Sequence, residues 1–247
     1  MKLEEKLKKH AGEFSPVIPF DPAKDHFYQF DFTSRNKELK SEQIADTEQF
    51  GSYIQSKLAQ HHCRYGIGGY NEHRTLYARS KHFSVPLRSP ERRAGATEIL
   101  EEEKPRRLHL GIDIWGPAGT WVMSPLDAIV HSFAFNNNDS DYGTTIILTH
   151  NIDGIGFHTL YGHLSLNSIK NLRAGKRVGK GEVFTEFGMR FENGNWPPHL
   201  HFQIIKDLEE WDGDYPGVCN YEERAKWLEN CPDPDLILDL NKFIISK

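Results

Sequence analysis

The chain has 247 residues, of which 38% are hydrophobic and 26% charged, and a net charge of −5. These values are typical of an ordinary soluble globular protein, and they exclude a basic nucleic-acid-binding surface and an apolar run of roughly 20 residues that could span a membrane. The three cysteines form neither a disulfide framework nor a zinc-finger pattern. The N-terminus lacks the apolar stretch of a secretory signal, so we expect a cytoplasmic location, with export left open.

Residues 1–85 are predicted to form a partly helical N-terminal extension. Ser41 can cap a helix that carries Ile44, Phe50, Ile54 and Leu58 on one apolar face. The glycine-rich stretch 66–72 is interpreted as a turn, because no Gly-Lys-Ser/Thr follows it as a phosphate loop requires. Residues 86–107 are dense in Glu and Arg and are expected to form a solvated charged linker.

Short β-type runs separated by turn residues begin at residue 108. They cover residues 128–135, 144–150, 156–163, 176–187 and 199–205. This spacing predicts an antiparallel β-sheet core over residues 108–210, either a sandwich or a rolled sheet. In residues 211–247 a capping-box pattern opens a short helix at Asn220, and we expect this helix and the tail to pack on the core. The fold class is therefore mainly β, with helical additions (α+β).

Two histidines lie on the last β-type run, in the sequence His199-Leu200-His201-Phe202. On a strand, residues i and i+2 point to the same side, so both imidazoles share one face with Gln203. Leu200, Phe202 and Ile204 then face the core. Burying two histidines and a glutamine together has little packing value, so a cleft of functional importance is favoured over a half-exposed surface strand.

An upstream His109-Leu110-Gly111-Ile112-Asp113 supplies two further ligand types. In a fully extended segment His109 and Asp113 would lie ~13 Å apart, at about 3.3 Å per residue, which one metal ion cannot bridge. The chain must therefore bend between them, and Gly111 is the residue that permits it. A third element ends at His163, where alternation places Thr159, Tyr161 and His163 on one polar face.

Taken together, these motifs resemble the lysostaphin/LytM-type zinc metallopeptidases, in particular a branch without export signals. The order His-x-x-x-Asp, then Tyr-x-His-Leu, then His-Leu-His-Phe is similar to the family's order and separations, over roughly residues 108–205. The resemblance implies the family's antiparallel core, which is similar to lipoyl and biotinyl domains. It also implies a bound Zn²⁺ and a peptide or peptidoglycan-fragment substrate.

The resemblance also implies roles for individual residues. His109, Asp113 and His201 are the expected zinc ligands, and His163 and His199 the expected catalytic histidines. Tyr161 is a weaker candidate for stabilising developing charge. Trp196, just before the His-x-His strand, is a weak candidate for lining the substrate groove. His158 is the other weak candidate, as a residue supporting the site.

The residue chemistry agrees with hydrolysis by a metal-activated water. Two histidines and a carboxylate leave zinc an open position, where a water has a pKa near ~7. Because the chain lacks His-Glu-x-x-His, one of His163 and His199 must accept the water's proton, and the other can act as acid or oxyanion donor. The sequence does not assign which. The alternative function is a non-catalytic binding module on the same fold, but such modules typically lose ligands. A lysine-modified carrier, at Lys176 or Lys180, lacks a supporting motif.

Overall fold

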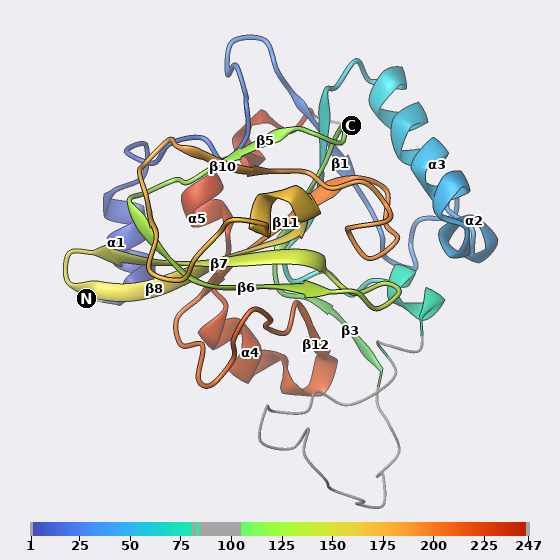
Figure 1. The fold of residues 1–247 in the computed structure, drawn as a ribbon. Helices are drawn as coiled ribbons and strands as arrows, with labels where there is room; N and C mark the ends of the chain where they lie inside the picture. The colour runs from blue at the N-terminus through green and yellow to red at the C-terminus, as the bar shows by residue number, and fades with distance from the viewer. Residues whose placement is uncertain (1, 81–82, 84–104, 246–247) are drawn as a thin grey trace, which may run out of the picture.

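A computed structural model gives the fold, and it describes residues 2–80, 83 and 105–245 (Figure 1). Most of the predicted charged linker, residues 86–104, lies outside the described residues. Within the described part of the chain, no helix is long and apolar enough to cross a membrane.

The core is an eight-stranded sheet with the strand order β1-β2-β4-β11-β8-β7-β6-β9. Seven neighbouring pairs make up this sheet; β1–β2 is parallel and the other six are antiparallel. The prediction of a mainly β, antiparallel core is therefore confirmed. The strands are β1 (Phe27–Phe30), β2 (Tyr65–Gly68), β4 (Ile112–Trp115), β6 (Ala128–Asn136), β7 (Gly143–Ile152), β8 (Ile155–Leu164), β9 (Arg177–Val178) and β11 (His199–Ile205).

The long strands β7 and β8 are joined by a tight turn at Asp153-Gly154. Both residues have positive φ, 48° and 84°. Two-residue hairpin loops of this kind favour Asp-Gly, because their twist matches that of the flanking strands. The turn thus sets the register of this hairpin as far as the pair Ile146–Tyr161.

Two smaller sheets flank the main one. β5 (Trp121–Met123) pairs with β10 (Val183–Glu186), and β3 (Arg106–His109) pairs with β12 (Val218–Asn220). The chain passes from β3 in one sheet to β4 in the other across Leu110 and Gly111. The predicted bend between His109 and Asp113 is therefore a change of sheet.

Helices cover the edges of the sheet (Figure 1). The prediction of one long helix capped by Ser41 is wrong in two respects. The segment forms two helices, α2 (Ser41–Ala45) and α3 (Thr47–Gln60), and Ser41 is the first residue of α2, whose N-cap is Lys40. Asp46 caps α3 by accepting from the backbone N–H groups of Glu48 and Gln49. The others are α1 (Leu3–Lys9), α4 (Arg224–Asn230), α5 (Asp235–Leu238) and the 3₁₀ segments η1 (Leu76–Arg79), η4 (Leu166–Ile169), η5 (Tyr221–Glu223) and η6 (Asn241–Phe243).

The side chains of strand β11 alternate between the hydrophobic core and a polar face. Leu200, Phe202 and Ile204 are buried in the largest hydrophobic cluster, as the alternation predicts. Strand β4 lies beside β11, and β2 pairs with β4 so that Gly68 is opposite Asp113. Residues 1–85, predicted as an extension, thus contribute two strands to the sheet of the core.

Candidate metal centre

Three strands, β3, β4 and β11, bring the expected ligands together. In the β4–β11 pair, His201 is directly opposite Asp113. His109 ends β3, and the change of sheet at Gly111 returns its side chain toward both. Gly111 has a further role there, because a Cβ atom on it would lie 2.5 Å from Cε1 of His201. The glycine is therefore required by the close approach of the histidine ring as well as by the bend.

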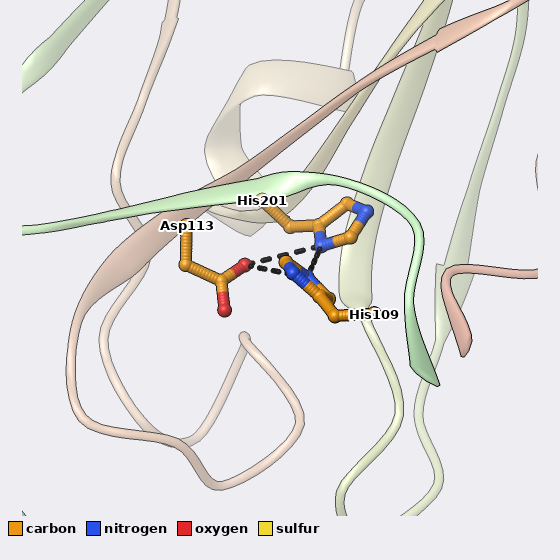
Figure 2. Close-up of side chains that lie close together, drawn as sticks. All are labelled: His109, Asp113 and His201. Atoms are coloured by element: carbon orange, nitrogen blue, oxygen red, sulfur yellow. Dashed lines mark hydrogen bonds and ion pairs between the residues drawn. The ribbon is translucent and has the colours of Figure 1, made fainter. Parts of the chain in front are cut away.

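The three ligand atoms face one another at short range (Figure 2). Nε2 of His109 lies 2.9 Å from Nδ1 of His201 and 3.2 Å from Oδ1 of Asp113, and Nδ1 of His201 lies 3.1 Å from the same oxygen. All three side chains are buried. They form the one group of three or more metal-ligating side chains found among the described residues.

Hydrogen bonds outside the triangle fix which nitrogen of each ring is free. Nδ1 of His109 donates to the backbone carbonyl of Gly69 at 3.0 Å. Nε2 of His201 donates to Oε1 of Gln203 at 2.9 Å. In a neutral imidazole the other nitrogen then carries a lone pair. Two lone pairs and a carboxylate oxygen are thus directed at one point, with no proton between the two nitrogens.

This donor set fits a divalent cation. Tetrahedral zinc with bonds of about 2.0–2.1 Å sets its ligand atoms about 3.3 Å apart, close to the three distances of the triangle. A cation at the centre would also remove the repulsion between the two nitrogen lone pairs. His109, Asp113 and His201 could therefore hold a metal ion with one position left for water or substrate.

Arg74 is the buried partner of the ligand carboxylate. Its Nη1 donates to Oδ2 of Asp113, and its Nε donates to Oε2 of Glu72 at 2.8 Å. Burial opposes ionisation of Asp113, but His109 and Arg74 together hold the pKa of this carboxyl well below its ordinary value. Burial, with a smaller effect of Arg74, lowers the pKa of His109 to about 3. Both groups are therefore in the protonation state that binds metal.

His163 and His199 lie side by side next to this triangle. Their ring centroids are 4.1 Å apart. Nδ1 of His163 donates to the carbonyl of Asn193 and Nδ1 of His199 to that of Pro197, both at 2.8 Å. The indole of Trp115 stacks on His199 at 3.9 Å. Each ring therefore keeps Nε2 as a hydrogen-bond acceptor.

Burial dominates the protonation of both rings. It lowers the pKa of His199 to about 4, and together with the neighbouring His199 it lowers the pKa of His163 well below the ordinary value. Both imidazoles are thus neutral at pH 7. A neutral imidazole with a free Nε2 can accept a proton from a nearby water.

A cavity of about 350 Å³ opens onto these side chains. Its floor is formed by Asp113, His163, His199 and His201, and Trp196 lies in its wall, where a substrate groove was predicted. Other walls come from Arg74, Leu76, Tyr77 and Phe83 in the N-terminal part of the chain, and from residues 140–142 and 214–218. Aromatic rings make up much of the lining, as in sites that bind an organic ligand.

The predicted position of Tyr161 is wrong. A β-bulge sets Gly162 and His163 opposite the single residue Thr145, and His163 has a φ of 64°. The bulge reverses the alternation, so Tyr161 turns away from the cavity. Its ring packs in the core against Phe184 and Phe202.

Tyr142, which sequence reasoning missed, lines the cavity instead. Its hydroxyl lies 3.4 Å from Nε2 of His201, and its ring contacts His163. Burial raises the pKa of Tyr142 well above its ordinary value, so the phenol stays protonated. Tyr142 was missed because it stands before Gly143 with no alternating pattern around it. Its phenol oxygen also packs against Gly217, where a Cβ atom would lie 1.9 Å away, and that glycine is far away in sequence.

The prediction for His158 is also wrong. Its Nδ1 lies 3.0 Å from Oγ1 of Thr149 and its ring contacts His131, outside the residues that line the cavity. His158 lies on β8 before the bulge and so follows the regular alternation of that strand. It has no contact with the candidate metal ligands.

A buried His-Asp-His donor set with two neutral imidazoles beside a cavity is typical of metal-dependent hydrolases. Residues 107–213 match the model of peptidase family M23. This match agrees with the resemblance to lysostaphin/LytM-type peptidases that the motifs of the segment indicate.

The relatives that match cover different shares of this chain. The DD-carboxypeptidase/endopeptidase Mpg of Neisseria meningitidis serogroup B is 34% identical over 97 residues, which are 39% of this chain and 20% of that protein. The chain thus spans a fifth of the length of this curated relative. Among solved structures, the catalytic domain of lysostaphin from Staphylococcus simulans is 19% identical, with a TM-score of 0.37 over 71% of this chain and 97% of that one. A zinc-containing peptidase from Vibrio cholerae is 27% identical, with a TM-score of 0.32 over 40% and 27%.

Proposed function

We propose that this protein is a zinc-dependent endopeptidase that cleaves amide bonds in peptides of the peptidoglycan type. The observation that carries the proposal is the triangle of His109, Asp113 and His201, whose lone pairs converge at 2.9–3.2 Å. The family of residues 107–213 and the name of the Neisseria relative support a peptidase that acts on cell-wall peptides.

Each step of the proposed hydrolysis can be given to a particular residue of the site. A zinc ion held by the three ligands would polarise the scissile carbonyl and lower the pKa of water to about 7. His163 and His199 each present an unprotonated Nε2 toward the cavity side of the site and can take up the proton of the attacking water. The second imidazole can then pass a proton to the leaving amine.

Tyr142 fits the third task, stabilisation of the oxyanion. Its phenol is held protonated by burial and lies at the wall of the cavity beside His201. A neutral donor fixed in a buried site stabilises developing negative charge without reorganisation. Trp196 and Trp115 give the cavity an aromatic lining that a substrate can pack against.

The test separates metal binding from hydrolysis. Purified protein, wild type and two variants, is assayed for zinc content and for cleavage of muropeptides and glycine-rich peptides. We expect about one zinc per chain in wild type, loss of zinc in His201→Ala, and retained zinc with loss of cleavage in His199→Ala. Wild type without zinc would favour the binding-module alternative. Full activity of both variants would overturn the proposal.

A further inference from the structure

We propose that Arg74 is a positioning residue that holds Asp113 as a one-oxygen metal ligand. Arg74 lies outside the matched segment 107–213, in the N-terminal part of the chain. The inference rests on the metal site of the proposed function. It adds that this site is incomplete without a residue that the M23 segment does not contain.

Each of the three guanidinium nitrogens of Arg74 has a partner. Nη1 donates to Oδ2 of Asp113 and also lies 3.2 Å from the hydroxyl of Tyr77. Nη2 donates to the carbonyl of Gly69 at 3.1 Å, and Nε to Glu72 at 2.8 Å. The residue is fully buried. A buried cation with this many fixed acceptors has one geometry, which a lysine cannot reproduce.

The segment around Arg74 also encloses the first histidine ligand. The carbonyl of Gly69 accepts from Nη2 of Arg74 and from Nδ1 of His109. The backbone N–H of His109 donates to the carbonyl of Glu72 at 3.0 Å, and its carbonyl accepts from Asn71 at 3.0 Å. Arg74 and His109 are therefore fixed by the same short stretch, residues 69–74.

The division of the Asp113 carboxylate follows from this geometry. Oδ2 is engaged by the guanidinium, whereas Oδ1 faces His109 and His201 at 3.2 and 3.1 Å. A carboxylate free of such a partner can rotate and bind a cation through both oxygens. Arg74 thus keeps the site to three ligand atoms and leaves room for water and substrate.

The experiment compares Co²⁺ binding by full-length wild type, Arg74→Met and Arg74→Lys. Affinity is measured by chelator competition, and coordination by the intensity of the visible Co²⁺ absorption, which falls when a four-coordinate site gains a fifth ligand. We expect Arg74→Met to bind ~10–100-fold more weakly, the usual effect of losing a partner of a metal ligand. Its visible bands should be weaker per bound ion. Arg74→Lys should lie between the two.

The matched control is Arg79→Met. Arg79 lies in the same segment, donates to Thr47 at 2.9 Å and stacks on Trp196, but has no contact with Asp113. It should leave Co²⁺ affinity and spectrum as in wild type. If Arg74→Met does not fold, the double variant Arg74→Met/Glu72→Gln also removes the carboxylate left unpaired. We expect the double variant to show the same weakening and the same loss of band intensity.

The outcomes separate the two proposals. Wild type that fails to bind Co²⁺ removes the metal site and the inference with it. Binding by wild type, together with an unchanged affinity and spectrum in Arg74→Met or the double variant, overturns the role of Arg74 alone. An equal loss in Arg79→Met overturns it too, since that would be a general effect of losing an arginine from this part of the chain.

Discussion

Gly111→Ala is the sharpest test of how the site is packed. A Cβ atom at this position would lie 2.5 and 2.6 Å from Cε1 and Nε2 of His201 and 2.8 Å from the backbone oxygen of Phe202. The His201 ring cannot move aside freely, because its Nε2 is bonded to Gln203 and its ring contacts Tyr142. Overpacking of this kind destabilises a protein by typically 1–3 kcal/mol. We expect a loss of this size, and a metal affinity reduced by ~100-fold or more, because the ligand itself is displaced.

The control for this substitution is Gly156→Ala on β8. The nearest atom to a Cβ there is the backbone oxygen of His150, at 4.0 Å, so the methyl group has room. Urea unfolding gives the free energy of each variant, and chelator competition gives the metal affinity. Gly156→Ala should change neither the free energy of unfolding nor the metal affinity by much. If Gly111→Ala binds metal as tightly as wild type, the glycine is not needed for the approach of His201, and this reasoning fails.

Three further predictions concern single side chains. Tyr142→Phe removes the proposed oxyanion donor and should lower kcat by ~10²–10³-fold with metal retained. Tyr161→Phe, in the core, should leave kcat nearly unchanged. Steady-state kinetics together with metal analysis distinguishes the two variants. Gln203→Leu removes the acceptor of His201 Nε2 and should weaken metal binding by ~10–100-fold in chelator competition. Burial lowers the pKa of His150 to about 4, below the unfolded value near 6.5. Its stabilising contribution is therefore complete above pH 6.5 and is lost as the pH falls toward 4. This contribution amounts to up to about 3 kcal/mol. Urea unfolding at pH 7 and 4.5 should therefore show a smaller decline in the free energy of unfolding for His150→Gln than for wild type.

Much of this site could be predicted from the sequence because strand geometry is periodic. The alternation on β11 predicted which side chains face the core and which face the site, and Leu200 and His201 lie as expected. The length of an extended chain showed that His109 and Asp113 could meet only across a bend at Gly111. These inferences use local geometry alone, and the structure agrees with each of them.

The sequence failed where the site depends on breaks in that geometry or on distant segments. One extra residue in β8, at the bulge of Gly162 and His163, reversed the alternation, so Tyr161 lies in the core. Tyr142, from the segment before β7, lines the cavity. Gly162, a glycine inside a strand pattern, is the local signal of this bulge that the alternation argument did not use. Arg74 was missed for another reason, since its partner Asp113 lies 39 residues away and is reached only through the β2–β4 pairing.

The hydrogen-bond acceptors around the site explain how four buried histidines can act together. The rings of His109, His163 and His199 each donate to a backbone carbonyl, and His201 donates to the neutral amide oxygen of Gln203. None of these acceptors carries a charge, so none favours protonation as a carboxylate would. Among the groups that contact these four rings, the negative charge lies on Asp113, where Arg74 offsets part of it. An incoming cation meets lone pairs from two histidines and one charged oxygen, while the other two imidazoles stay free to accept protons. Replacing Gln203 by Glu tests this arrangement. The added charge should strengthen the hydrogen bond from Nε2 of His201 and tighten metal binding, and an unchanged affinity in chelator competition would show that the neutrality of the acceptor is immaterial.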